Sequence, residues 1–204
     1  MCGVVGFSCQ YAKSFHYDIL HKIILQSKIR GLHSFGYSYT KNNKLITQKY
    51  HEVDNVELPK ADKIIYHNRY ATSGDYTDHV NNQPLSNNKL SLVFNGVIDM
   101  RTKQEMEKHY NIKMNTYNDG EIILQKCGDD KKKLQQYVSD MSGSFAGLIL
   151  TASNNLLAIR NANRPLWVLK YKTASYYAST KDIFKRVDKD FEPTQLKVLK
   201  LYED

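Results

Sequence analysis

The sequence has little of what would suggest a secreted, metal-binding or membrane protein. Its three cysteines, Cys2, Cys9 and Cys127, form no CxxC pair and no zinc-ligand spacing with the seven histidines. An odd, sparse set of cysteines argues for free thiols and against a disulfide framework. No stretch is apolar for long enough to span a bilayer, and "CGVVGF" is too short for a signal-peptide core. We therefore expect a cytoplasmic protein without membrane association.

The sequence also lacks any nucleic-acid-binding motif, although its formal net charge is +8. The positive residues are scattered, and the densest run is the "DDKKK" of residues 129–133. A lysine-rich solvated surface explains such a charge better than a nucleic-acid interface, which would gather the charge on one face. We therefore expect no nucleic-acid partner.

What is present indicates one globular domain over residues 1–204. The chain is 41% hydrophobic, and no repeat or linker divides it. Short β-branched or aromatic runs bounded by Gly, Asn, Pro or Ser predict strands at residues 2–8, 35–40, 44–50, 63–71, 90–96, 143–151, 155–161, 165–171, 175–180 and 196–202. Helices are predicted at residues 15–27, 101–110, 119–127 and 132–141. This order indicates an α+β fold in which sheets pack on each other under helices.

The N-terminal "MCGVVGF" offers a candidate nucleophile. Cells usually remove Met1 when a small residue follows, and the mature chain would then begin at Cys2. A terminal cysteine carries a thiol together with an α-amine, which titrates near neutrality and can accept the thiol proton. On this stretch alone, the favoured interpretation is that Cys2 is a small buried residue at the start of a strand.

Three further stretches place polar groups where strands or helices begin and end. In "HNRYATSG", Arg69 and Thr72 could hold a carboxylate, or Arg69 could simply pair with a nearby acid. In "VFNGVID", Asn95 and Gly96 could form an ordinary turn or could donate to a developing oxyanion. In "YNDGEIIL", Asp119 could bind an ammonium group or cap a helix.

Taken together, these groups point to one ligand. An arginine and a threonine suit an α-carboxylate, an aspartate suits an α-ammonium, and a thiol with an oxyanion pair suits an amide carbonyl. L-Glutamine carries all three groups, and asparagine is a shorter alternative.

Nine segments, in this order, resemble class II glutamine amidotransferase domains, the N-terminal-nucleophile glutaminases of enzymes such as glucosamine-6-phosphate synthase and amidophosphoribosyltransferase. They extend over nearly the whole chain and are "MCGVVGF", "RGLHSFG", "HNRYATSG", "NNQPL", "NGVI", "NDGEII", "MSGSFAGLIL", "AIRNANRPLWV" and "YASTKDIF". Any one of them is a weak signal, but nine in the family's order make chance a poor explanation.

The resemblance implies a role for each matching residue. Cys2 would be the nucleophile and its amine the base, while Asn95 and Gly96 would form the oxyanion hole. Arg69, Thr72 and Ser73 match positions around the glutamine carboxylate, although Ser73 replaces a histidine of the glucosamine synthases. Asp119 matches the residue that holds the ammonium group, and Arg30 matches an arginine that supports the N-terminal strand.

The resemblance also implies the αββα four-layer sandwich of N-terminal-nucleophile hydrolases, with two antiparallel sheets between helical layers. It implies glutamine hydrolysis without a metal or organic cofactor, and a separate synthase subunit that uses the ammonia. Two alternatives remain open, namely a hydrolase of another amide and a catalytically silent glutamine-binding module. Cys9, Cys127 and the histidines outside these motifs are expected to be packing or surface residues.

Overall fold

The structure is a computed structural model of residues 1–204, and it describes all of them except 52–56, 72–74, 142, 162–163 and 199–201. Within the described residues, no helix is long and apolar enough to cross a membrane.

The larger sheet has seven antiparallel strands with the N-terminal strand near its centre. Its members are β1 (Gly3–Ser8), β2 (Ser34–Lys41), β3 (Lys44–Tyr50), β4 (Lys63–Arg69), β9 (Trp167–Tyr171), β10 (Ala174–Ala178) and β11 (Thr194–Gln195). They lie in the order β11-β9-β10-β1-β4-β2-β3. On β1, Gly3 pairs with Asn68 of β4 and Val5 pairs with Ala178 of β10.

The smaller sheet has five antiparallel strands. They are β5 (Leu85–Ser86), β6 (Leu90–Val97), β7 (Ser144–Thr151), β8 (Leu156–Arg160) and β12 (Tyr202–Glu203), in the order β12-β8-β7-β6-β5. The long β6–β7 pairing runs from Leu90 opposite Thr151 to Val97 opposite Ser144.

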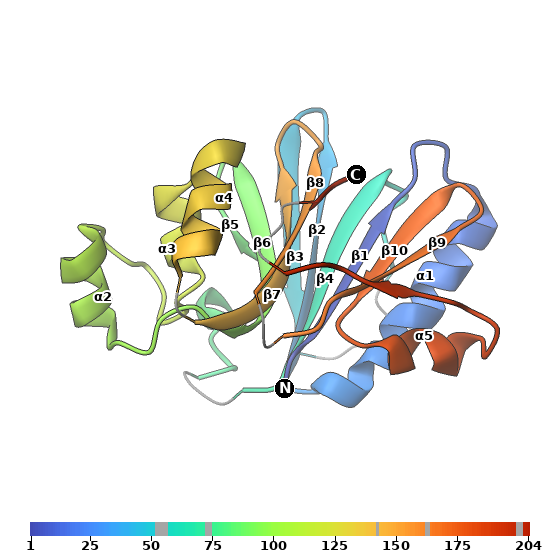
Figure 1. The fold of residues 1–204 in the computed structure, drawn as a ribbon, viewed down its shortest axis with the longest axis horizontal. Helices are drawn as coiled ribbons and strands as arrows, with labels where there is room; N and C mark the ends of the chain where they lie inside the picture. The colour runs from blue at the N-terminus through green and yellow to red at the C-terminus, as the bar shows by residue number, and fades with distance from the viewer. Residues whose placement is uncertain (52–56, 72–74, 142, 162–163, 199–201) are drawn as a thin grey trace.

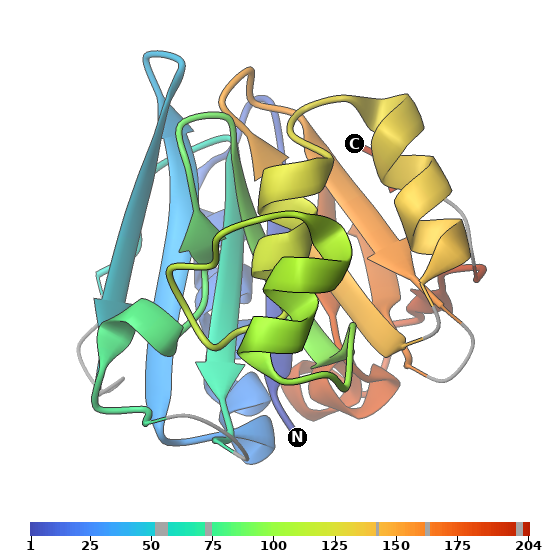
Figure 2. The same cartoon turned by 90° about the vertical axis from the view of Figure 1, so that its left-hand side faces the viewer.

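Helices cover the outer face of each sheet. The helices are α1 (Ser14–Ser27), α2 (Lys103–Tyr110), α3 (Glu121–Lys126), α4 (Lys131–Asp140) and α5 (Lys181–Val187), with 3-10 turns η1 (Lys28–Arg30) and η2 (His79–Asn81). Figure 1 shows α1 and α5 on one side of the paired sheets and α3 and α4 on the other, with α2 farther out. In Figure 2 the α2–α4 side faces the viewer. The expected αββα sandwich is therefore confirmed.

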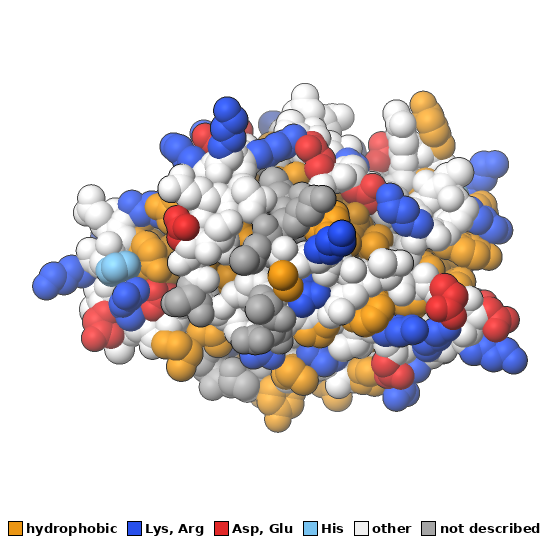
Figure 3. Space-filling model, viewed as in Figure 1, with side chains coloured by type: hydrophobic (Ala, Val, Ile, Leu, Met, Phe, Trp, Pro, Cys, Tyr) orange, Lys and Arg blue, Asp and Glu red, His pale blue; other side chains and the backbone are white. Residues whose placement is uncertain are grey.

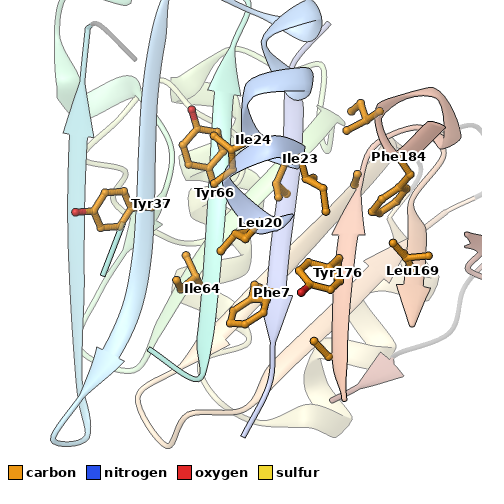
Figure 4. Packing of buried hydrophobic residues seen from close by; sticks show 14 of the residues in the cluster. Phe7, Leu20, Ile23, Ile24, Tyr37, Ile64, Tyr66, Leu169, Tyr176 and Phe184 are labelled. Carbon is orange, nitrogen blue, oxygen red and sulfur yellow. The ribbon is translucent and has the colours of Figure 1, made fainter. Parts of the chain in front are cut away.

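Three hydrophobic clusters correspond to the three interfaces between these layers. Leu20, Ile23 and Ile24 of α1 follow helical spacing and pack with Phe7 and Tyr176 on the outer face of the larger sheet (Figure 4). A second cluster joins α3 and α4 to the smaller sheet. The third fills the space between the sheets. Burying each large side chain of these clusters stabilises the fold by about 1.5–3 kcal/mol.

The two sheets come very close at Gly6 in the middle of β1. A Cβ atom there would lie 2.4 Å from Cδ1 of Leu148 on β7. Because that distance is far below van der Waals contact, the side chain of Leu148 would have to shift to make room for a larger residue at position 6.

Most predicted elements are present, with differences near the C-terminus. The single strand expected at residues 196–202 is wrong for residues 196–198, since the strands are β11 at 194–195 and β12 at 202–203. The backbone amide of Leu196 donates instead to the carbonyl oxygen of Leu166, which holds this part of the chain beside the start of β9. The helix α5 and the short strand β5 were not expected from the sequence.

Candidate functional site

Cys2 lies immediately before the central strand β1, at the end of the molecule where Figure 1 marks the N-terminus. Its Sγ atom is 3.7 Å from the carbonyl oxygen of Tyr70, just beyond the end of β4. The side chain is partly exposed, whereas Cys9 and Cys127 are buried, and none of the three is in a disulfide. Burial raises the pKa of the Cys127 thiol to about 12, so that thiol stays protonated near neutral pH. Cys2 is thus the cysteine that a ligand can reach.

Strand periodicity directs the candidate residues toward the space between the sheets. Val4 on β1, Ile65 on β4 and Val93 on β6 all belong to the inter-sheet cluster. Because side chains two residues apart share a face, Cys2 and Asn95 belong to the same inter-sheet faces as Val4 and Val93. The same rule applied to Ile65 selects His67 and Arg69, which line one cavity with Cys2. Residues distant in sequence therefore meet at one end of the sandwich.

Asn95 and Gly96 lie within strand β6, so the alternative of an ordinary Asn-Gly turn is wrong. The amide nitrogen Nδ2 of Asn95 is buried and has no hydrogen-bond partner among the described residues. Gly96 has a φ of +131°, and a Cβ atom at this position would lie 1.9 Å from the carbonyl oxygen of Ser144. Only glycine tolerates that conformation. Strand β6 thus carries the unpaired donor of Asn95 next to Gly96, whose backbone conformation other residues cannot adopt.

Arg69 ends β4 on the wall formed by the larger sheet. Its Nη1 donates to the side-chain oxygen of Asn82 and, at 3.3 Å, to the carbonyl oxygen of Asn81. Burial lowers the pKa of this guanidinium, while the nearby Cys2 has the opposite effect. These hydrogen bonds therefore hold the guanidinium of Arg69 in one orientation at the wall of the cavity, where it supplies a positive charge. The other two residues expected to hold a carboxylate, Thr72 and Ser73, lie outside the described residues.

Asp119 lies in the loop before α3, and the alternative that it caps this helix is wrong. The N-cap residue of α3 is Gly120. The Asp119 carboxylate instead accepts hydrogen bonds from the backbone amides of Ile98 and Asp99, the second at 3.0 Å. Burial raises the pKa of Asp119, and these two hydrogen bonds oppose the shift. A carboxylate held in this way can offer its remaining acceptor sites to a cation in the cavity.

The cavity brings together Cys2, Arg69, Gly96 and Asp119 from four separate segments of the chain. The remaining residues that line it are His67, Tyr70, Asn81, Gln83, Phe94, Tyr117 and Asn118. Hydrophobic side chains gather along the lower edge of the surface in Figure 3, where Figure 1 marks the N-terminus. Exposed Met1, Tyr70 and Tyr117 lie in or next to this site. Within the described residues, no group of three or more His, Cys, Asp or Glu side chains could hold a metal ion.

Arg30 contacts the backbone of the chain at Cys2 and Gly3, just before and at the start of β1. Its Nε donates to the carbonyl oxygen of Cys2 at 3.2 Å. The aliphatic part of Arg30 also packs under Gly3, where an added Cβ atom would lie 3.1 Å from the arginine Cβ. The residue expected to support the N-terminal strand is therefore in contact with it.

Sequence reasoning missed His67, which is 1% exposed and lines the cavity. Burial, reinforced by the charge of Arg69, lowers the pKa of His67 to about 3, so the imidazole is neutral near pH 7. The backbone of Phe94 lies near the ring, but neither ring nitrogen has a hydrogen bond of ordinary geometry within the described part of the chain. The alternation Ile65, His67, Arg69 could have revealed it, because it places the imidazole on the same face as the arginine.

Asn81 was also missed as a contributor to the site. Its carbonyl accepts from Arg69, and its Oδ1 accepts from the backbone amide of Tyr117 at 3.0 Å. It therefore joins the end of β4 to the loop that carries Asp119. The sequence gives no local signal for this link, which spans 36 residues.

Comparison with known proteins shows the family of this chain and the likeness of its fold. The family model of the glutamine amidotransferase domain matches residues 67–186, more than half of the chain. Glutamine phosphoribosylpyrophosphate amidotransferase from B. subtilis, solved with ADP and GMP, has a TM-score of 0.77 at 22% identity, over 100% of this chain and 49% of that one. The allosteric regulatory enzyme of purine biosynthesis has a TM-score of 0.75 at 24% identity, over 96% of this chain and 44% of that one.

This chain thus spans about half the length of either structure, and at these identities the likeness concerns the fold. A comparison with curated proteins gave no match. The residues matched by the family model include His67, Arg69, the Asn95-Gly96 pair and Asp119. On this evidence, the chain belongs to the glutamine amidotransferase domain family.

Proposed function

We propose that residues 1–204 form one class II glutaminase domain that hydrolyses L-glutamine to glutamate and ammonia through a thioester on Cys2. The observation that carries the proposal is the buried, unpaired Nδ2 of Asn95. Asn95 precedes Gly96 on β6, and Gly96 lines the cavity together with Cys2. An unpaired buried donor lowers the stability of the folded protein, so its presence calls for an explanation. A hydrogen bond to an oxyanion that forms only during the reaction is such an explanation.

The substrate would be held by charges at two walls of the cavity. Arg69, with Thr72 and Ser73, would bind the α-carboxylate, and Asp119 would accept from the α-ammonium. The orientation of Arg69 by Asn81 and Asn82 supports this assignment. The Asp119 carboxylate is likewise fixed by backbone amides before any ligand arrives. Such preorganisation lowers the entropy cost of binding.

The reaction would begin after Met1 is removed. The neutral α-amine of Cys2 takes the thiol proton, and Sγ forms a bond to the side-chain carbonyl carbon of glutamine. Asn95 Nδ2 and the Gly96 N–H donate to the oxyanion. The ammonium then returns its proton to the amide nitrogen as the carbon–nitrogen bond breaks, and ammonia leaves. Water attacks the thioester, the carbon–sulfur bond breaks, and glutamate and the thiol are restored.

We further propose that the ammonia is used by a separate synthase subunit, since free ammonia is mostly protonated at neutral pH and would be lost. The exposed side chains of Tyr70 and Tyr117 beside the cavity are consistent with a partner that covers its mouth. The absence of disulfides among the three cysteines fits a cytoplasmic location.

The test is covalent labelling combined with steady-state kinetics. The purified chain is first checked by intact mass for loss of Met1, then treated with 6-diazo-5-oxo-L-norleucine, a glutamine analogue. We expect one label, on Cys2, and no glutaminase turnover in Cys2→Ala. Cys127→Ala is the matched control and should keep both label and turnover. Turnover in a homogeneous Cys2→Ala preparation would refute the mechanism. Faster hydrolysis of an N-acyl amide than of glutamine would instead favour a different amide substrate.

A further inference from the structure

The side chain of Met1 lies between two arginines. Its Sδ atom is 3.4 Å from Nη1 of Arg164 and 3.6 Å from Nη2 of Arg30. Arg30 also contacts the carbonyl oxygen of Cys2. When Met1 is removed, the thioether between the two guanidiniums goes with it, and the new α-amine of Cys2 is left beside them.

Arg164 comes from a part of the chain far from Arg30, in the connection between β8 and β9. Its Nε atom is buried and has no hydrogen-bond partner among the described residues. The positive charge of Arg164 contributes to the lowered pKa of Arg30, for which burial is the larger cause. Two like charges are therefore held close together, an arrangement that costs stability and calls for a reason.

The charged groups around the N-terminal residue are mostly positive. Arg30 approaches from η1, Arg69 from the end of β4 and Arg164 from the β8–β9 connection. Across the cavity, Asp119 is the one acid among the described lining residues, and its carboxylate is bonded to backbone amides. The other groups near this end are His67, which is neutral, His33, whose Nδ1 accepts from the Ala71 amide, and exposed Asp75, whose charge acts on Arg69.

We propose that Arg164 is a positioning residue that, paired with Arg30, keeps the α-amine of mature Cys2 unprotonated near neutral pH. The proposal rests on the function proposed above, in which that amine is the base. An α-amine ordinarily titrates near pH 7.7–8.0, so most of it is protonated at pH 7 and cannot accept a proton. A neighbouring positive charge disfavours the protonated form and increases the fraction of competent base.

The experiment compares pH–rate profiles of kcat/KM for glutamine between pH 5 and 9. Arg164→Met keeps length but loses charge, Arg164→Lys keeps charge but loses the planar fork, and Arg186→Met is a distant control whose arginine pairs with Asp182 on α5. We expect the acid limb of Arg164→Met to move up by about one pH unit, because loss of a neighbouring positive charge raises the pKa of the amine. Arg164→Lys and Arg186→Met should keep the wild-type limb.

Salt gives a second measure, and its wild-type arm can be read without any variant. Raising the ionic strength from about 0.05 M to 1 M screens exposed charges, so the wild-type acid limb should move up and the Arg164→Met limb should move less. An unmoved acid limb in Arg164→Met, or an equal loss of rate at every pH, would overturn the proposal. If Arg164→Met does not fold, an unmoved wild-type limb at high salt overturns it equally.

The result also separates this inference from the proposed function. If the wild-type chain turns over glutamine while intact mass shows Met1 in place, the proposed base is wrong. The other case is a wild-type chain that begins at Cys2 and is active, with an acid limb that shifts neither in Arg164→Met nor with salt. In that case only the role of Arg164 is wrong.

Discussion

Replacing Asn95 with alanine should lower the catalytic activity but leave the stability of the fold unchanged or slightly higher. In the folded protein, Nδ2 of Asn95 is buried without a partner among the described residues. The substitution removes a donor that the proposed oxyanion needs, and it also removes a polar group that the resting protein leaves unsatisfied. We therefore expect a large loss of kcat with little loss of stability.

The two magnitudes follow from separate physical effects. Loss of one oxyanion donor raises the barrier by about 3–4 kcal/mol, which is roughly a 100- to 1,000-fold fall in kcat. Removing an unsatisfied buried amide relieves about 1–3 kcal/mol of desolvation cost. The small cavity left by the shorter side chain costs about 1 kcal/mol in the other direction. The net change in the free energy of unfolding should therefore lie between about zero and a 2 kcal/mol gain.

Asn161→Ala is the matched control, because Asn161 is equally buried but fully partnered. Its Oδ1 accepts from the Phe145 amide at 2.8 Å, and its Nδ2 donates to the carbonyl of Gly143. Leaving both backbone groups unpaired should cost about 2–4 kcal/mol, or a fall in Tm of roughly 5–10 °C. Urea unfolding and glutaminase kinetics are measured for both variants. If Asn95→Ala loses as much stability as Asn161→Ala, the amide of Asn95 has a structural partner and our reasoning is wrong.

Three further outcomes are expected. Asp119→Asn should raise KM for glutamine by about 10- to 100-fold with little change in kcat, because a charge-assisted hydrogen bond contributes about 1.5–3 kcal/mol to binding; a fall in kcat alone would contradict this. Gly96→Ala should cost more than about 3 kcal/mol of stability. Gly128→Ala, where φ is +57° and no atom lies within 4 Å, should cost only about 1–2 kcal/mol by urea unfolding; equal losses would refute the steric argument. The folded pKa of His67 is about 3, against 6.5 when unfolded, so the unfolded chain gains a proton first as pH falls and stability drops below pH 6.5. His67→Gln should therefore lose about 2 kcal/mol less stability than wild type between pH 7 and pH 5, and identical pH dependences would count against a buried neutral imidazole.

The sequence predicts the layers of this fold well because most strands are covered on both faces or alternate clearly. All six residues of β1 are buried, and α1 has its apolar residues at helical spacing. Some local patterns have more than one solution. The strand expected at residues 90–96 is present as β6, but its Asn95-Gly96 pair also fits an ordinary turn, and the pairing of Gly96 with Phe145 on β7 decides between the two.

The same limit applies to the polar groups of the site. Asp119 precedes a helix and reads as a cap, but its backbone partners Ile98 and Asp99 lie about twenty residues earlier. Arg164 gives no local sign of lying beside Met1, which is 163 residues away. Strand parity, by contrast, would have been sufficient to place His67 on the same face as Arg69, although His67 was missed. Long-range polar contacts are therefore what sequence reasoning lacked.

The central position of β1 has a consequence for the timing of synthesis. This first strand pairs with β4 and with β10, and β10 ends only at Ala178. At 5–20 residues per second, the ribosome needs roughly 9–36 s to make the chain from the N-terminus to the end of β10 at Ala178. During that time the strand cannot complete its pairing, and Met1 is not yet packed against Arg164. An aminopeptidase that acts on nascent chains therefore meets an extended, accessible N-terminus. Because β10 is made late, the active site cannot close around the N-terminus before the aminopeptidase has had time to remove Met1 and expose Cys2.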